Sequence, residues 1–133
     1  MKKIGYKKVK QLVNGKAKVR ILKLEILGQV IVPYRNCGGL KKRTSRVRVL
    51  AAYSVRESVS SFSIFAKHRL DKELKAKGPY VPYHFHCDIT FGFQYFVGKI
   101  AVPAQALNKA EDMSCGSGIH FFSTLKEALA YNG

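Results

Sequence analysis

Cationic and apolar residues alternate along two stretches of this chain, and the alternation restricts the fold more than any other feature. Within residues 40–53, Arg46 and Arg48 occupy one parity while Val47 and Val49 occupy the other. A period of two is typical of a β-strand with one face in a core and the other in water. Outward side chains on such a strand are about 7 Å apart, which is close to the phosphate repeat of a nucleic acid. The cationic face is therefore either an ordinary solvated face or a surface for a phosphate backbone.

The N-terminal region is predicted to form a β-hairpin. Strands are expected at residues 5–12 and 16–27, because Asn14-Gly15 between two apolar-patterned runs is the strongest short hairpin signal. In the second strand the apolar parity changes between Ile21 and Leu22. This change predicts a β-bulge or sharp bend at that point.

The rest of the chain reads as further strands and one terminal helix. Residues 28–33 form a short apolar connection, residues 34–39 a loop, and residues 54–65 a strand. For residues 66–77 we expect a short surface helix or a charged loop, because Leu70 and Leu74 stand four apart among charges.

The C-terminal half is rich in aromatic residues. Seven Phe and Tyr residues between positions 80 and 97 predict a sheet core, followed by a loop over 98–113 with a helical turn at 104–107. A strand is expected to end at Phe122, and Thr124 with Glu127 has the spacing of a capping box at the start of a helix. The predicted fold class is α+β: one domain over residues 1–133, mostly antiparallel sheet, with a C-terminal helix and room for one further short helix.

Charge is unevenly divided along the chain. The net charge is +16, and residues 1–77 hold 21 basic and four acidic residues, whereas residues 78–133 hold three basic and four acidic residues. Such segregation costs self-repulsion in a compact state, and a polyanionic partner would relieve it. Nucleic acid is the commonest such partner, followed by an anionic membrane surface and an acidic protein segment.

Composition also limits the setting. The three cysteines Cys37, Cys87 and Cys115 are an odd, sparse set that indicates free thiols in a reducing compartment. No apolar run is long enough to span a bilayer, and no apolar segment follows the charged N-terminus as a secretory signal would require, so neither membrane insertion nor secretion is expected.

The segment Cys115–Tyr131, CGSGIHFFSTLKEALAY, resembles the closing motif of a domain found in many giant-virus proteins, often after pentapeptide or ankyrin-like repeats. The early Tyr6-Lys7-Lys8, the strand Lys23–Ile26 and the step Tyr95–Gly98 fit the same pattern, and GIHFF is its specific part. With its basic charge and no repeats, the chain resembles the small basic virion proteins of Marseillevirus-type viruses (Marseilleviridae). The resemblance implies a virion protein present in the host cytoplasm during infection, and it transfers no catalytic residue.

The basic surface is the strongest candidate site. If the strands near residues 6–12, 16–21 and 46–53 share one sheet, their outward cations would pool into one positive field around the loop at 41–43. Arginine can grip a phosphate with two donors and lysine adds a mobile charge. The predicted nucleic-acid-binding residues are Lys7, Lys8, Lys10, Lys16, Lys18, Arg20, Lys41, Lys42, Arg43, Arg46 and Arg48.

Other chemistry is less well supported by the sequence. His84, His86 and Cys87 offer metal-ligand atoms, with Cys115 and His120 as further ligands if the fold brings them close, but no second ligand pair completes a tetrahedral site. His120 as a general base would need a nucleophile and a carboxylate beside it, and a buried structural histidine is the more ordinary interpretation. Neither a cofactor nor a catalytic residue is predicted.

Stacking of bases on Tyr80 or Tyr83 is open, although a place in the core is the safer interpretation of both. No motif in the chain predicts base reading. The sequence therefore predicts a non-enzymatic, sequence-independent binder of double-stranded DNA, with RNA as an alternative, that neutralises or tethers the genome of a large DNA virus particle. A homodimer and contacts with other virion proteins are expected. The alternatives are a structural virion protein packed against acidic partners and a cryptic enzyme such as a nuclease.

Overall fold

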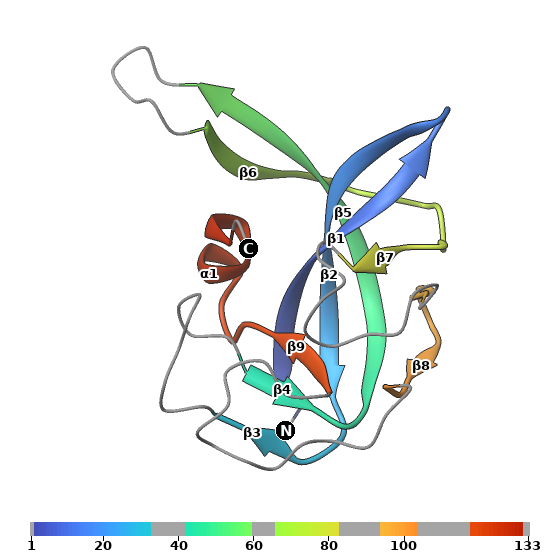
Figure 1. Ribbon diagram of the computed structural model, residues 1–133, viewed down its shortest axis with the longest axis vertical. Helices are drawn as coiled ribbons and strands as arrows, with labels where there is room; N and C mark the ends of the chain where they lie inside the picture. Colours follow the sequence, from blue (N-terminus) through green and yellow to red (C-terminus); the bar gives the residue numbers. More distant parts are fainter. Residues whose placement is uncertain (1, 33–41, 60–65, 83–93, 104–117, 132–133) are drawn as a thin grey trace.

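The computed structural model of this protein describes residues 2–32, 42–59, 66–82, 94–103 and 118–131. Two antiparallel sheets and one helix make up these residues (Figure 1). The larger sheet has the order β6-β5-β2-β1-β7, and β8 also pairs with β5. Its strands are β1 (Ile4–Val13), β2 (Lys16–Ile26), β5 (Val47–Val59), β6 (Ala66–Glu73), β7 (Val81–Pro82) and β8 (Ile100–Ala101).

The smaller sheet has the order β3-β4-β9, and the helix α1 follows it closely in the chain. Its strands are β3 (Val30–Ile31), β4 (Lys42–Thr44) and β9 (Ile119–Phe121), and the helix is α1 (Leu125–Ala130). This arrangement confirms the predicted α+β class with a mostly antiparallel sheet and a C-terminal helix. The further helix is wrong for residues 66–73, which form β6, and the proposed helical turn at 104–107 lies outside the described residues.

The hairpin prediction is confirmed at its turn. Strands β1 and β2 pair in unbroken register from Ile4–Glu25 to Val13–Lys16, which leaves Asn14 and Gly15 as the two-residue loop. Asn14 has φ 52° and Gly15 has φ 79°. Positive φ at both central residues is the type I′ geometry that matches the twist of a hairpin, and Asn-Gly is the pair that adopts it most easily.

The parity change in β2 has a different cause from the one predicted. No bulge interrupts the pairing with β1, so the expected irregularity at Ile21–Leu22 is wrong for that side of the strand. The register shift lies between Lys23 and Leu24 against β5, where Leu50 is the extra residue. Ile21 and Leu22 are both fully buried because the sheet is covered on both faces.

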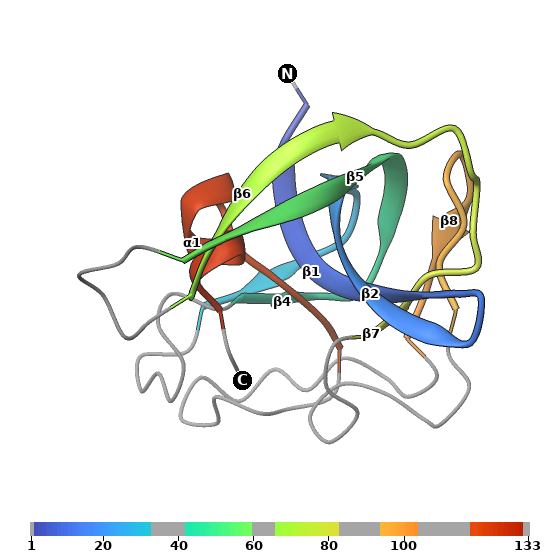
Figure 2. The same cartoon turned by 90° about the horizontal axis from the view of Figure 1, so that it is seen from above.

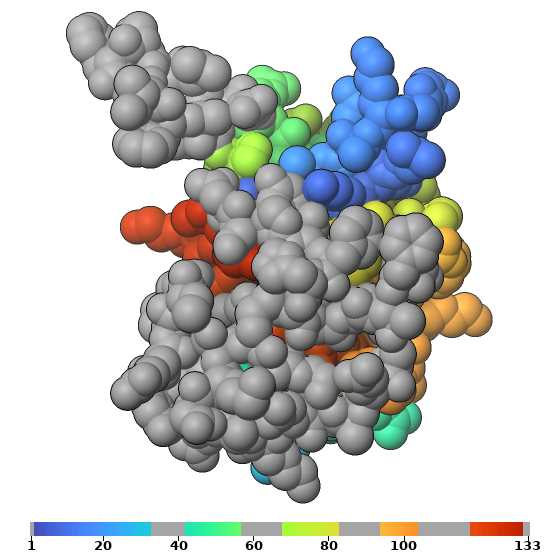
Figure 3. Space-filling view, viewed as in Figure 1, coloured from blue at the N-terminus to red at the C-terminus, as the bar shows by residue number. Residues whose placement is uncertain are grey.

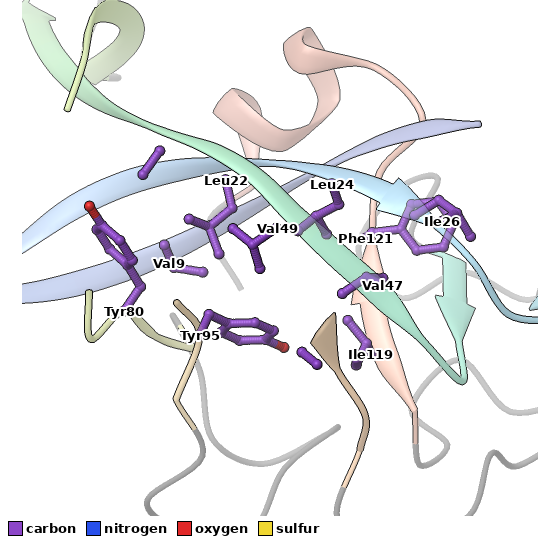
Figure 4. Close-up of a cluster of buried hydrophobic side chains, with 12 residues drawn as sticks. Val9, Leu22, Leu24, Ile26, Val47, Val49, Tyr80, Tyr95, Ile119 and Phe121 are labelled. Carbon is purple, nitrogen blue, oxygen red and sulfur yellow. The ribbon is translucent and has the colours of Figure 1, made fainter. Parts of the chain in front are cut away.

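The main core lies on one face of the larger sheet, between that sheet and β9 (Figure 4). Leu22 and Leu24 of β2 contribute to it, and Tyr80 and Tyr95 close one side through a backbone bridge. Phe121 packs directly on β1, where a Cβ at Gly5 would lie 2.5 Å from a ring carbon of Phe121. The other buried members are Val9, Ile26, Val47, Val49, Ala52, Ala101 and Ile119. The predicted aromatic core is thus present in Tyr80 and Tyr95, while residues 83–93 lie outside the described part.

A second cluster covers the opposite face of the sheet. Ile21 of β2 and Ala128 of α1 are completely buried there. Phe122, which directly follows β9 in the chain, is the third buried member of the cluster. The helix begins as predicted: Thr124 is the N-cap, and its hydroxyl accepts a hydrogen bond from the Glu127 backbone N–H at 3.2 Å. Figure 1 shows α1 beside the larger sheet, below β6.

Lys8 of β1 joins the sheet to the end of this helix. Its side chain is only 2% exposed, and its ammonium donates to the carbonyl oxygens of Tyr131 at 2.7 Å and Leu129 at 3.2 Å. His68 of β6 is a third contact, with Nδ1 2.9 Å from the Lys8 Nζ. A cation at a helix C-terminus satisfies carbonyls that have no partner within the helix, and α1 has no basic residue in its own last turn.

Replacing Lys8 with methionine should lower the free energy of unfolding by about 2–4 kcal/mol, because buried carbonyls lose a charged donor. Urea denaturation followed by circular dichroism measures this change. Lys16→Met is the matched control, since Lys16 is an exposed lysine of the same hairpin and its replacement should cost less than about 0.5 kcal/mol. Equal midpoints for the two variants would show that the contacts of Lys8 do not stabilise the fold.

Candidate nucleic-acid interface

Three of the predicted binding residues are buried, so the expectation that they face solvent is wrong. Lys7 is 7% exposed and its Nζ donates to the backbone oxygen of His120 at 2.8 Å. Lys8 is enclosed by α1 and β6, as described above. Arg43 is 1% exposed in the smaller sheet, and burial lowers the pKa of its guanidinium.

The physical reason is coverage of β1 from both sides. Lys7 pairs with Leu22 and points to the main core, whereas Lys8 pairs with Ile21 and points to the helix. An alternating strand normally leaves one parity in water, but here neither parity is free in the middle of the strand. Consecutive lysines can enter a folded interior in this way because each ammonium reaches a carbonyl or ring nitrogen.

The remaining predicted cations do not form one surface either. Strands β1, β2 and β5 share one sheet, as expected, but Arg48 lies at the opposite end of that sheet from the hairpin turn and pairs with Glu25 at 3.4 Å. Arg46 is near it, with its backbone oxygen accepting from Leu27 N–H. Lys42, on β4, donates a hydrogen bond from its ammonium to the Ser123 hydroxyl. Lys41 lies outside the described residues.

The hairpin itself divides its cations between its two faces. Val13–Lys16, Gln11–Lys18 and Val9–Arg20 are directly opposed pairs. Opposed residues of an antiparallel pair lie on one face, so Lys16, Lys18 and Arg20 share the face that leads into the main core. Lys10 pairs with Val19 and is on the other face.

The larger sheet divides into two ribbons at this end. Pairing between β2 and β5 stops at Arg20–Ser54, although β2 continues back to Lys16 and β5 continues to Val59. Beyond this point, among the residues described, β2 pairs only with β1 and β5 only with β6, while Lys10 of β1 also pairs with Val81 of β7. Figures 1 and 2 show the two ribbons pointing away from each other. We call this region the forked end.

The second ribbon brings cations that the sequence analysis did not select. Arg56 of β5 lies directly opposite Arg69 of β6, and both are exposed. Arg56 is two residues after Ser54, which opposes Arg20, so it shares a face with the hairpin cations. Asp71 is within 3.7 Å of Arg56 at the surface. The five residues Lys16, Lys18, Arg20, Arg56 and Arg69 are called the fork cations below.

The sequence of the second ribbon, β5–β6, carries a periodic signal, but that signal favours a helix or loop in place of a strand. Arg69 falls in the run AKHRLDKE, where Leu70 and Leu74 at a spacing of four favoured a helix or loop. In the structure Leu70 instead opposes Val55 across the β5–β6 pair. Arg69 could be identified as a surface cation of the sheet only by pairing residues 66–73 with the β-forming residues before them. Each run taken separately does not show this pairing.

The base of the fork is held by Arg20. Its Nε donates to Gln11 Oε1 at 2.9 Å, which fixes the guanidinium across the hairpin. Burial raises the pKa of Tyr80, and the positive charge of Arg20 opposes that rise. Arg20 is half-exposed, whereas Lys16 and Lys18 are exposed to solvent.

The described residues offer little for other kinds of site. They contain no group of three or more His, Cys, Asp or Glu side chains placed to hold a metal ion. Four residues considered for metal binding, His84, His86, Cys87 and Cys115, lie outside them, and His120 is buried in β9. No helix in the part that the structure describes is long and apolar enough to cross a membrane.

Comparison with known proteins adds no relative. No family model, no curated protein and no solved structure matches this chain. The geometry of the forked end is therefore the basis for any functional proposal.

The burial of Lys7 predicts a structural role that can be separated from ligand binding. Lys7→Met should reduce stability by about 1–3 kcal/mol, because the His120 carbonyl loses its donor inside the core. At a temperature where the variant is folded, its affinity for DNA should equal that of the native chain. Thermal melts and fluorescence anisotropy with a labelled duplex measure the two properties. A variant of native stability that binds DNA more weakly would place Lys7 in the interface.

Proposed function

We propose that this protein is a non-enzymatic, sequence-independent DNA-binding protein that contacts the phosphate backbone through the fork cations. The observation that carries the proposal is that five cations from two separate ribbons lie on the same face of the larger sheet at the forked end. Arg56 and Arg69 are directly opposed like charges, and Asp71 at 3.7 Å from Arg56 supplies one negative charge against the two, so the pair keeps a positive charge that a polyanion can neutralise.

The spacing of the cations suits a polyanionic chain. Lys16, Lys18 and Arg20 alternate along one strand, which places them about 7 Å apart in succession, near the separation of consecutive phosphates. Arginine in the second ribbon supplies paired donors for phosphate oxygens. Contacts of this kind position a duplex without reading its bases, so binding is expected to be independent of sequence.

The setting of the function rests on the sequence resemblance to small basic virion proteins. On that basis the DNA is the genome of a large DNA virus, and the protein acts in the virion and, during infection, in the host cytoplasm. Neutralising or tethering the genome is the role we propose there. A homodimer would double the number of cationic surfaces and raise the avidity for DNA without new contacts.

A structural role in the virion against an acidic protein partner is the second candidate. Exposed apolar side chains around β8 favour it, since Phe96, Ile100 and Val102 are 39–57% exposed. These residues lie away from the hairpin turn, in the segment that pairs with the start of β5. A protein partner could use both this apolar segment and the cations.

Binding to duplex DNA should fall steeply as salt rises. With five phosphate contacts, the logarithm of the affinity should change with the logarithm of salt concentration at a slope of about −4 to −5. Fluorescence anisotropy with several unrelated duplexes, between about 50 and 300 mM salt, measures the slope and the dependence on sequence. Affinities that agree for all duplexes support the proposal, and the DNA should stay intact when Mg²⁺ is added.

Substitutions can locate the contact surface within the same experiment. Lys18→Gln and Arg56→Gln should each reduce the steepness of the slope by about one, and the double variant by about two, because each removes one phosphate contact. Arg46→Gln is the matched control, being an exposed arginine directly before β5, at the end away from the forked end. Absence of binding at about 50 mM salt, where phosphate contacts are strongest, would exclude the proposal. Binding of polyglutamate without binding of DNA would select the second candidate.

A further inference from the structure

The tip of the β1–β2 hairpin carries an exposed leucine. Leu12 is 73% exposed, the highest value among the large apolar side chains described. It lies two residues before Asn14, where the turn begins, and its cross-strand partner Ala17 is also exposed. The hairpin stands out from the rest of the surface in Figure 3. An apolar side chain therefore lies at a projecting end of the molecule.

Nothing in the fold requires leucine at this position. The main core reaches Val9 on β1, and the cluster under α1 reaches Ile21 on β2, so burial ends before the tip. Leaving a leucine in water forgoes the hydrophobic stabilisation that burying it would supply. A single exposed leucine is ordinary on a protein surface, but this one has an unusual electrostatic setting.

All charged residues around Leu12 in the sequence are positive. Residues 2–24 contain no Asp or Glu, and Glu25 is the first acidic residue of the chain. Lys10 lies on the same face of the hairpin as Leu12, while Lys16 and Lys18 lie on the opposite face. The apolar tip is thus flanked on both faces by cations, which matches a partner with an apolar slot between two anionic edges.

We propose that the hairpin tip enters a groove of duplex DNA and that Leu12 inserts between adjacent base pairs and kinks the duplex. This inference rests on the proposed DNA-binding function and adds a mode of recognition to it. Base steps are apolar and lie between two phosphate strands, so they match the tip in both respects. Apolar wedges on minor-groove proteins act in this way, exchanging the cost of unstacking for a bent duplex that contacts more of the protein.

An anionic membrane would also attract a cationic hairpin, but the apolar area is too small for it. A whole myristoyl chain gives only marginal, reversible membrane binding, and one leucine with a neighbouring alanine buries much less. One side chain is, by contrast, what a single opened base step can accept. The number of apolar residues at the tip therefore favours DNA.

The experiment measures DNA bending directly. A duplex of about 20–30 base pairs carries a donor and an acceptor dye at its ends, and saturating protein is added at low salt, where binding to phosphates is strong. The native chain should raise energy transfer, and Leu12→Ala should abolish that rise while changing affinity by no more than about tenfold, since the fork cations remain. Leu12→Met should retain the bend because methionine is a comparable wedge.

A second measurement tests unstacking. The native chain should prefer a duplex with a central mismatch over a fully paired one by several-fold to about tenfold, because part of the unstacking cost is already met. Leu12→Ala should lose the preference. Val102→Ala is the matched control, being an exposed aliphatic residue (57%) far from the tip in the sheet, and it should behave as the native chain does.

The outcomes separate this inference from the proposed function. No DNA binding at all would reject the proposed function, and the wedge with it. Tight, salt-dependent binding with no change in energy transfer, or an equal change for native and Leu12→Ala chains, would reject the wedge alone. Co-flotation with phosphatidylserine vesicles that requires Leu12, without DNA bending, would also reject it and assign the tip to a membrane surface.

Discussion

The unbroken register of the β1–β2 pair determines where nearly every important side chain of this structure lies. Ten consecutive residue pairs, from Ile4–Glu25 to Val13–Lys16, leave no freedom to exchange the two faces. A slip of one residue would move Lys7 out of the core and Lys16 off the fork face. The Asn14–Gly15 turn selects this register because its two positive φ angles close the hairpin with two residues. The turn thus assigns each hairpin residue to one face of the sheet, and the core, the helix contact and the forked end are built on that assignment.

The features that the sequence could predict are local ones. The turn depends on two adjacent residues, and the helix start depends on Thr124 and Glu127, three apart. The fates of Lys7 and Lys8 depend instead on partners 113 to 123 positions away. A lysine pattern looks identical whether the ammonium meets water or a distant carbonyl, so local periodicity could not identify the buried cations.

The candidate site shows the same limit. Lys16, Lys18 and Arg20 were grouped correctly, because alternation along one strand is visible in the chain. Arg69 was missed because the spacing of Leu70 and Leu74 is compatible with a helix, and only pairing with β5 makes the segment a strand. The predicted basic surface is too large for a related reason, because residues of one sheet need not lie on one face. Lys10 and Arg48 lie on the face opposite to the fork cations.

The contact between Lys8 and the last turn of α1 has a consequence for how the chain is made. Strand β1 is synthesised first, but the carbonyl groups that its lysine requires belong to Leu129 and Tyr131. The bridge between Tyr6 and Phe122 adds a second link of the same kind. The hairpin depends on contacts close in sequence, whereas the interior around it is complete only when the segment up to Tyr131 has joined it. Completing this interior therefore requires contacts between residues 121 to 123 positions apart, which carry a high cost in loop-closure entropy.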